Sequence, residues 1–178
     1  DIWHDARECW LDGDSADSTH HIVIQGDVEL CDGFGAAMTD AIRAVPNRMI
    51  GFYGNHKSIR EAAEEGHNWI QLEGGVWGQC VCVPSVDVAE MVEWIDYYFE
   101  DDFIHDDTML AGWSQLAQPD AVWFPIPQLV QHKGADDSSM VHQMPVHFTA
   151  ALYFGASGVA VWGTVSTFVF SDVSLMWC

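Results

Sequence analysis

The spacing of hydrophobic residues predicts strands and helices that alternate along most of the chain. Short apolar runs bounded by glycine, proline or acidic residues are typical of buried strands. Such runs occur at 21–25, 48–53, 69–72, 76–83 and 121–124. Helical spacing recurs at 3–11, 34–45, 57–65, 84–99 and 107–117. This alternation predicts an α/β domain with three layers, in which helices cover a mostly parallel central sheet.

Charge narrows the classes of protein that fit this pattern. The chain has 27 Asp and Glu against six Lys and Arg, a formal net charge of −21, yet 49% of its residues are hydrophobic. An apolar fraction of this size, with nine Trp and nine Phe, excludes a disordered chain. The acidic excess is typical of proteins adapted to high salt, where counterions screen the self-repulsion. It argues against a nucleic-acid partner, which needs a basic surface.

The five cysteines follow no metal-finger spacing and no obvious disulfide framework. Cys80 and Cys82 alternate along one predicted strand, so both should pack on the same face of the sheet. Free, packed thiols favour a reducing compartment. We therefore expect a protein of the cytoplasm of a salt-adapted host, with a virus particle of such a host as the alternative.

The last part of the chain differs from the rest. All six basic residues lie at or before Lys133, and the stretch 149–170 has no charged residue. That stretch is long enough to span a bilayer, but its Gly, Ser, Thr and Val residues favour strands. We expect a main domain at 1–142 and an apolar tail of strands at 143–178 packed on the same domain, with membrane association through 149–170 as the less favoured alternative.

Two carboxylates follow the first predicted strand. Asp27 and Glu29 are one residue apart, directly after an apolar run. Carboxylates at the carboxyl end of a strand are suited to a hard cation such as Mg²⁺ or Mn²⁺, with coordination positions left for phosphates. A solvated acidic turn is the alternative interpretation.

Three further motifs follow in order. A glycine loop, Gly74-Gly75-Val76-Trp77-Gly78, either forms a plain turn or lets a ligand come close to the backbone. Asp106 and Asp107 precede a helix; one carboxylate is expected to cap it and the other to be available as a general base. His132, next to Lys133, is either an ordinary surface histidine or a metal ligand.

The ordered set resembles GT-A-type glycosyltransferases, particularly the small bacterial, archaeal and tailed-phage members. The matching stretches are 20–34, 69–79, 105–113 and 127–132. The resemblance implies a GT-A-like, Rossmann-like fold. The first strand and nucleotide-binding loop of that fold find no place before Trp3, so either a segment precedes this chain or the domain lacks that strand. Gly26 stands where relatives usually carry an acidic residue.

The resemblance also implies an activity and roles for residues. The activity is transfer of a sugar from a nucleotide-sugar donor to a hydroxyl of a glycan or protein acceptor, with Mn²⁺ or Mg²⁺ and with inversion expected at the sugar carbon. Asp27, Glu29 and His132 match the metal ligands. Asp107, with Asp106 as the second choice, matches the base that deprotonates the acceptor.

Substrate contacts are expected from Gly74, Gly75, Trp77 and Lys133 in the same picture. Two other classes stay open. One is a catalytically degenerate relative that serves as a structural or glycan-binding module, for instance on a halophilic virus, because tryptophans can stack on sugars. The other is a divalent-cation hydrolase, for which the sequence offers no second carboxylate cluster at two-metal spacing.

Overall fold

The computed structural model describes residues 2–12, 17–99, 105–116, 121–132 and 167–170. It contains a mixed sheet with strand order β1-β5-β3-β6-β4-β8. The strands are β1 (His20–Ile24), β3 (Ile50–Gly51), β4 (Trp69–Leu72), β5 (Cys80–Pro84), β6 (Val122–Pro125) and β8 (Thr167–Phe170). A second, two-stranded sheet pairs β2 (Val28–Leu30) with β7 (Val130–His132) in antiparallel fashion.

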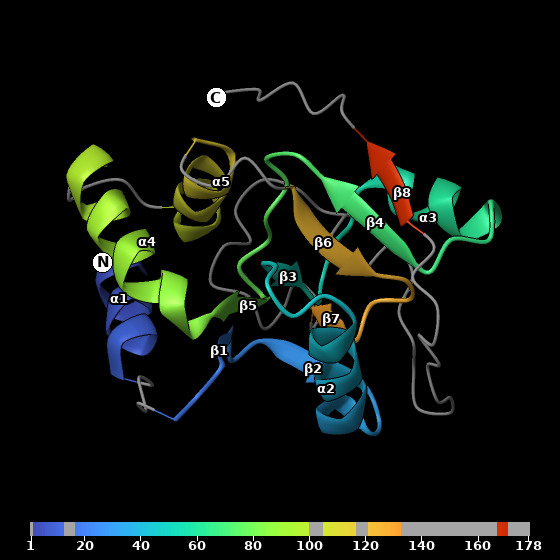
Figure 1. Ribbon diagram of the computed structural model, residues 1–178, viewed down its shortest axis with the longest axis horizontal. Coiled ribbons are helices and arrows are strands. Elements are labelled where there is room, and N and C mark those ends of the chain that lie inside the picture. Colours follow the sequence, from blue (N-terminus) through green and yellow to red (C-terminus); the bar gives the residue numbers. More distant parts are fainter. Residues whose placement is uncertain (1, 13–16, 100–104, 117–120, 133–166, 171–178) are drawn as a thin grey trace.

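The described residues form five helices, which flank the main sheet (Figure 1). They are α1 (Ile2–Asp12), α2 (Phe34–Ala44), α3 (Lys57–Glu64), α4 (Ser85–Tyr98) and α5 (Asp106–Leu116). Each agrees with a helix predicted from hydrophobic spacing to within one or two residues. The α/β architecture, with helices on a central sheet, is therefore confirmed.

The prediction of a mostly parallel sheet is wrong. Within β1-β5-β3-β6-β4, only β3 and β6 run parallel, and the other three neighbouring pairs are antiparallel. The added strand β8 runs parallel to β4. Alternating strands and helices do not fix strand direction, because hydrophobic spacing carries no information about which strands are neighbours. Here the single helix α3 joins β3 to β4, yet these strands run in opposite directions, since β6 is parallel to β3 and antiparallel to β4.

The core has two parts, one on each face of the sheet. Val81 and Val83 of β5 pack with residues of α1, α4 and α5. Cys80 and Cys82, which alternate with them, pack on the other face with residues of α2 and of the β2–β7 sheet. The four described cysteines are free thiols, and burial raises the pKa of Cys82 to about 12. The predicted packing role of Cys80 and Cys82 is confirmed.

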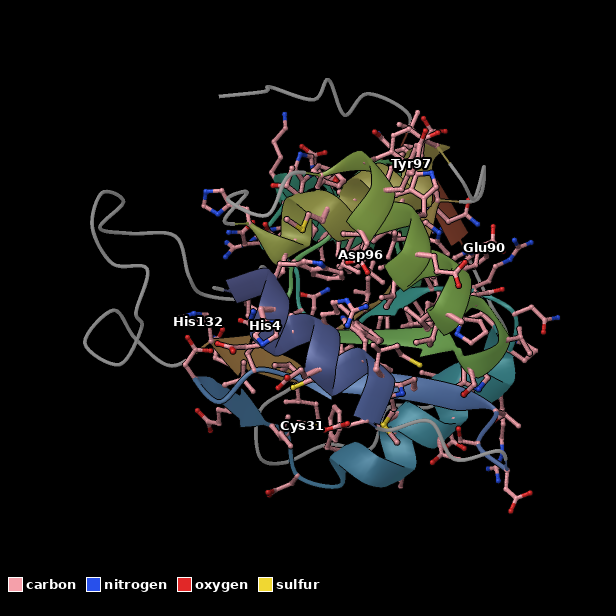
Figure 2. All side chains as sticks on the ribbon, turned by 90° about the vertical axis from the view of Figure 1, so that its left-hand side faces the viewer. His4, Cys31, Glu90, Asp96, Tyr97 and His132 are labelled. Carbon is pink, nitrogen blue, oxygen red and sulfur yellow. The ribbon has the colours of Figure 1, made fainter. Side chains whose placement is uncertain are left out.

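A carboxylate of α4 joins that helix to α1. Asp96 Oδ1 accepts a hydrogen bond of 3.0 Å from the Trp3 indole, and its Oδ2 accepts one of 2.9 Å from Arg7 Nε. Figure 2 shows Asp96 between these two helices. This contact uses one of the few basic residues of the chain to neutralise a carboxylate on an otherwise acidic helix.

The apolar tail is described only in part. Residues 167–170 form β8 beside β4, and the rest of 143–178 lies outside the described residues. No helix in the described part of the chain is both long and apolar enough to cross a membrane.

Screening of surface charge should stabilise this fold. We expect the melting temperature to rise between dilute buffer and molar KCl, because the Debye length falls from about 10 Å at 0.1 M salt to about 3 Å at 1 M, so repulsion between Asp and Glu is screened at shorter separations. Each 1 kcal/mol gained should raise it by roughly 2–4 °C for a domain of this size. Thermal denaturation followed by circular dichroism measures the effect. Glu90 and Glu93 are exposed on α4, so the double variant Glu90→Gln/Glu93→Gln should show a smaller salt dependence. An unchanged melting temperature across this range would contradict the halophilic interpretation.

Candidate functional site at the turn after β1

The structure brings Asp27 and His132 together. Val28 lies opposite His132 in the β2–β7 ladder, so the turn residue just before β2 faces the histidine at the end of β7. His132 Nε2 is 3.3 Å from Asp27 Oδ2, and the two side chains are 2% and 24% exposed. Tyr53 packs behind the imidazole with ring centroids 6.3 Å apart. Figure 2 shows His132 at the end of β7.

One oxygen of this pair is buried without a partner. Asp27 Oδ1 makes no hydrogen bond to any described residue. Leaving a buried polar atom unsatisfied costs about 1–3 kcal/mol, so the atom is suited to bind something from outside the chain. A cation is the natural ligand for a carboxylate oxygen in this position.

The pair fits a divalent cation held by two protein ligands. In an octahedral site with bonds of about 2.0–2.1 Å, adjacent ligand atoms are about 3 Å apart, close to the separation of His132 Nε2 and Asp27 Oδ2. Mg²⁺ usually takes only one or two carboxylates, with water and substrate phosphates completing its shell. Within the described residues, no three His, Cys, Asp or Glu side chains are grouped to hold a metal.

Glu29 does not join this pair as the sequence suggested. It lies in β2 opposite Gln131 and is exposed. Successive side chains of a strand point to opposite faces, so Glu29 lies on the other face of the small sheet from Val28 and His132. The predicted set of three ligands is thus reduced to Asp27 and His132 in this structure.

Asp106 faces the same turn from α5. The helix begins at Asp106, one residue earlier than predicted. The Asp106 Oδ2 atom lies 3.5 Å from Gln25 Nε2, and Oδ1 accepts the Asp107 N–H at 2.9 Å. Burial raises the pKa of the Asp106 carboxyl, the charge of Asp107 raises it further, and the hydrogen bonds from Gln25 and the backbone lower it in part.

Asp107 is engaged locally instead. Its Oδ1 accepts the Thr108 N–H at 2.7 Å and lies 3.4 Å from the Thr108 hydroxyl. Both aspartates therefore accept a backbone N–H in the first turn, which agrees with the favourable position of carboxylates there. Only Asp106 also contacts a residue of β1 or its turn among the contacts described. The sequence suggested that Asp106 caps the helix and that Asp107 is the available carboxylate. The contacts favour Asp106 as the available carboxylate instead.

The end of the glycine loop meets Gln25 and Asp106. An ideal Cβ on Gly78 would lie 2.9 Å from Gln25 Nε2 and 3.0 Å from Asp106 Oδ2. Any side chain at position 78 would have to displace the ends of these two side chains. The next residue, Gln79, receives the Gln25 N–H on its carbonyl at 3.0 Å. Its side-chain Oε1 is buried without a hydrogen-bond partner among the described residues.

The other predicted substrate contacts have structural explanations. Gly74 has a φ of 66°, and a Cβ there would collide with Gln115 of α5. Gly75 lies against Leu72, and the Trp77 ring packs edge-on against Phe124 at 5.4 Å. These contacts account for Gly74, Gly75 and Trp77 by packing, and they leave no described contact that marks them as ligand groups. Lys133 lies outside the described residues.

Two side-chain pairs thus meet at one turn. The segment 25–27 joins Gln25, which contacts Asp106, to Asp27, which contacts His132. Two peptide units span at most about 7 Å between Cα atoms. The end of β1, the glycine loop, the start of α5 and the end of β7 therefore converge, although they are far apart in the sequence. The site combines a carboxylate–imidazole pair, Asp27 and His132, with a half-buried carboxylate, Asp106, whose pKa is raised.

Sequence reasoning missed Gln25 and Gln79. Both are amides at the ends of apolar strands, positions where a polar side chain would be half-buried. That pattern was visible in the sequence, but nothing in it indicated that β1 and β5 are neighbours. Comparison with known proteins adds no assignment: no family model and no curated protein matches the chain.

Proposed function

We propose that this chain is a metal-dependent glycosyltransferase that moves a sugar from a nucleotide-sugar donor to an acceptor hydroxyl. The observation that carries the proposal is the convergence of Asp27, His132 and Asp106 around the turn after β1. The resemblance to GT-A-type enzymes named these residues among its candidate metal ligands and bases. An unrelated set of surface residues would have no reason to meet at one turn.

Asp27 and His132 would hold Mn²⁺ or Mg²⁺ together with the donor diphosphate. Such an ion neutralises the charge that develops on the departing nucleoside diphosphate. Asp27 offers its unpaired Oδ1, and His132 is held in place by Tyr53 and by its strand. Their fixed placement means that little ordering is needed when the ion binds.

Asp106 would act as the general base. Its carboxylate would accept the proton of the acceptor hydroxyl while the hydroxyl oxygen attacks the sugar carbon on the face opposite the leaving group, which inverts the configuration. A base works best when its pKa approaches the working pH. Burial and the Asp107 charge shift the pKa of Asp106 in that direction.

The second candidate is a degenerate relative that binds glycans without turning over a nucleotide sugar. It is favoured by the exposed position of Glu29 and by the lack of a third grouped ligand in the described part of the chain. The two candidates differ in whether a donor binds.

Donor binding tests the proposal directly. Thermal shift of the full-length protein in molar KCl, with Mn²⁺ and a panel of nucleotide sugars, should show stabilisation by at least one donor, which grows with concentration as linkage requires. The stabilisation should need Mn²⁺ and should be lost in Asp27→Asn. Glycan-dependent stabilisation without any response to nucleotide sugars would support the second candidate.

A further inference from the structure

A glutamine at the end of β1 contacts the carboxylate assigned above as the base. Gln25 Nε2 is the donor toward Asp106 Oδ2 at 3.5 Å, and Gln25 is anchored by its own N–H to the Gln79 carbonyl at 3.0 Å. The backbone of Gln25 is thus fixed to the residue just before β5, and its side-chain amide reaches Asp106 at the start of α5. A contact of this length can tighten when substrate binds.

The glycine loop leaves room for this contact. A Cβ on Gly78 would come within 3.0 Å of both Gln25 Nε2 and Asp106 Oδ2. Both atoms are the far ends of side chains, so an added methyl group would push them apart more readily than it would disturb the backbone. Three segments are therefore arranged so that an amide donor can reach one carboxylate oxygen.

We propose that Gln25 is a positioning residue that holds the Asp106 carboxylate, in its ionised form, toward the turn at 25–27. This inference rests on the proposed function for the role of Asp106, but the contact itself does not. An amide N–H donated to a carboxylate favours its charged form. The second oxygen of Asp106 accepts the Asp107 N–H, so both oxygens are oriented, one from each side.

Few groups affect the pKa of Asp106. Asp107 is the charged side chain that acts on it, and the backbone N–H groups of Asp106 and Asp107 and the amide of Gln25 oppose that effect. The glycine loop contributes no titratable side chain between Gly74 and Gln79. Gln25 is therefore the one side-chain group in the described contacts whose removal should leave Asp106 easier to protonate.

The test is a graded series at position 25. Gln25→Met keeps the length of the side chain and removes the amide N–H donor, and Gln25→Glu replaces that donor by a negative charge. The pKa of Asp106, followed by carboxyl ¹³C NMR, should rise from wild type to Gln25→Met and again to Gln25→Glu. The acid limb of the pH profile of sugar transfer should move to higher pH in the same order. On that limb, Gln25→Met should transfer sugar roughly 2- to 12-fold more slowly, which corresponds to one hydrogen bond of about 0.5–1.5 kcal/mol.

Gly78→Ala provides an independent way to break the contact between Gln25 and Asp106. It should raise the pKa of Asp106 in the same sense as Gln25→Met, with little change in melting temperature. Gly35→Ala is the matched control, because a Cβ there meets no atom within 4 Å. An Asp106 pKa that is the same in wild type, Gln25→Met and Gly78→Ala would overturn the inference, even if the variants were less stable. Graded pKa values in a protein that transfers no sugar would uphold the role of Gln25 and overturn the proposed function instead.

Discussion

Asp106→Asn should reduce sugar transfer by roughly 10²- to 10⁴-fold, the usual contribution of a general base. The amide keeps the size of the side chain and can still accept the Asp107 N–H through its oxygen, but it cannot take a proton from the acceptor. Mn²⁺ binding should stay within a few-fold of wild type, because Asp106 is not one of the proposed ligands. Steady-state kinetics with a saturating donor measures the loss.

Stability should change in the opposite direction to activity in this variant. A carboxyl group whose pKa is higher in the folded protein than in the unfolded chain contributes stability at low pH, and that contribution is lost as pH rises through the folded pKa. The direction of the Asp106 shift therefore means that its ionised form opposes folding at neutral pH. Asp106→Asn removes this cost, so its melting temperature at pH 7 should equal or exceed that of wild type. A clear drop would indicate that Asp106 is mainly a structural cap.

Asp107→Asn is the matched control. It removes a neighbouring negative charge that raises the pKa of Asp106, so the acid limb of the pH profile should move to lower pH while the rate on the plateau changes little. The opposite result, with most activity lost in Asp107→Asn and kept in Asp106→Asn, would restore the assignment suggested by the sequence alone.

Asp27→Asn should weaken Mn²⁺ binding by at least 10-fold and remove most turnover with it. Loss of an outer-shell partner already costs about 10- to 100-fold in metal affinity, and Asp27 is proposed as a direct ligand. Isothermal titration of the protein with MnCl₂ in molar KCl measures the affinity. The carboxylate-to-amide change preserves side-chain volume, so packing around Val28 should be retained.

Glu29→Gln separates the structural account from the sequence-based one. Because Glu29 is exposed and lies across the ladder from Gln131, its variant should bind Mn²⁺ within a few-fold of wild type. Equal losses in Asp27→Asn and Glu29→Gln would instead indicate the three-ligand site predicted from the sequence. If neither variant changed Mn²⁺ affinity, the contact between Asp27 and His132 would be an ion pair and no metal site.

Much of the local structure could be predicted from the sequence. Hydrophobic spacing found the five helices of the described residues, and the alternation of Cys80 and Cys82 correctly placed both thiols on one face of the sheet. The strand at 48–53 was predicted too long, since only Ile50–Gly51 pairs as β3. Strand direction could not be predicted, because hydrophobic periodicity carries no information about which strands are neighbours.

The candidate site could be predicted only at residues whose type itself suggests a chemical role, such as a carboxylate or an imidazole that can bind a metal. Asp27 and His132 were proposed from their types and order, and the structure brings them together. The failure at Glu29 comes from the short β2–β7 sheet, a long-range pairing that no local signal in the sequence reveals. Gln25 was missed for the same reason, since its role depends on α5 lying beside the end of β1.

Metal-dependent turnover of a nucleotide sugar tests the central claim most directly. The full-length protein in molar KCl should release a nucleoside diphosphate from at least one donor when Mn²⁺ and an acceptor are present. The release should stop when the metal is chelated, and it should be lost in both Asp27→Asn and Asp106→Asn while Glu29→Gln keeps most of it. Wild-type protein that is folded in molar KCl but neither binds nor consumes any nucleotide sugar of the panel would contradict the account.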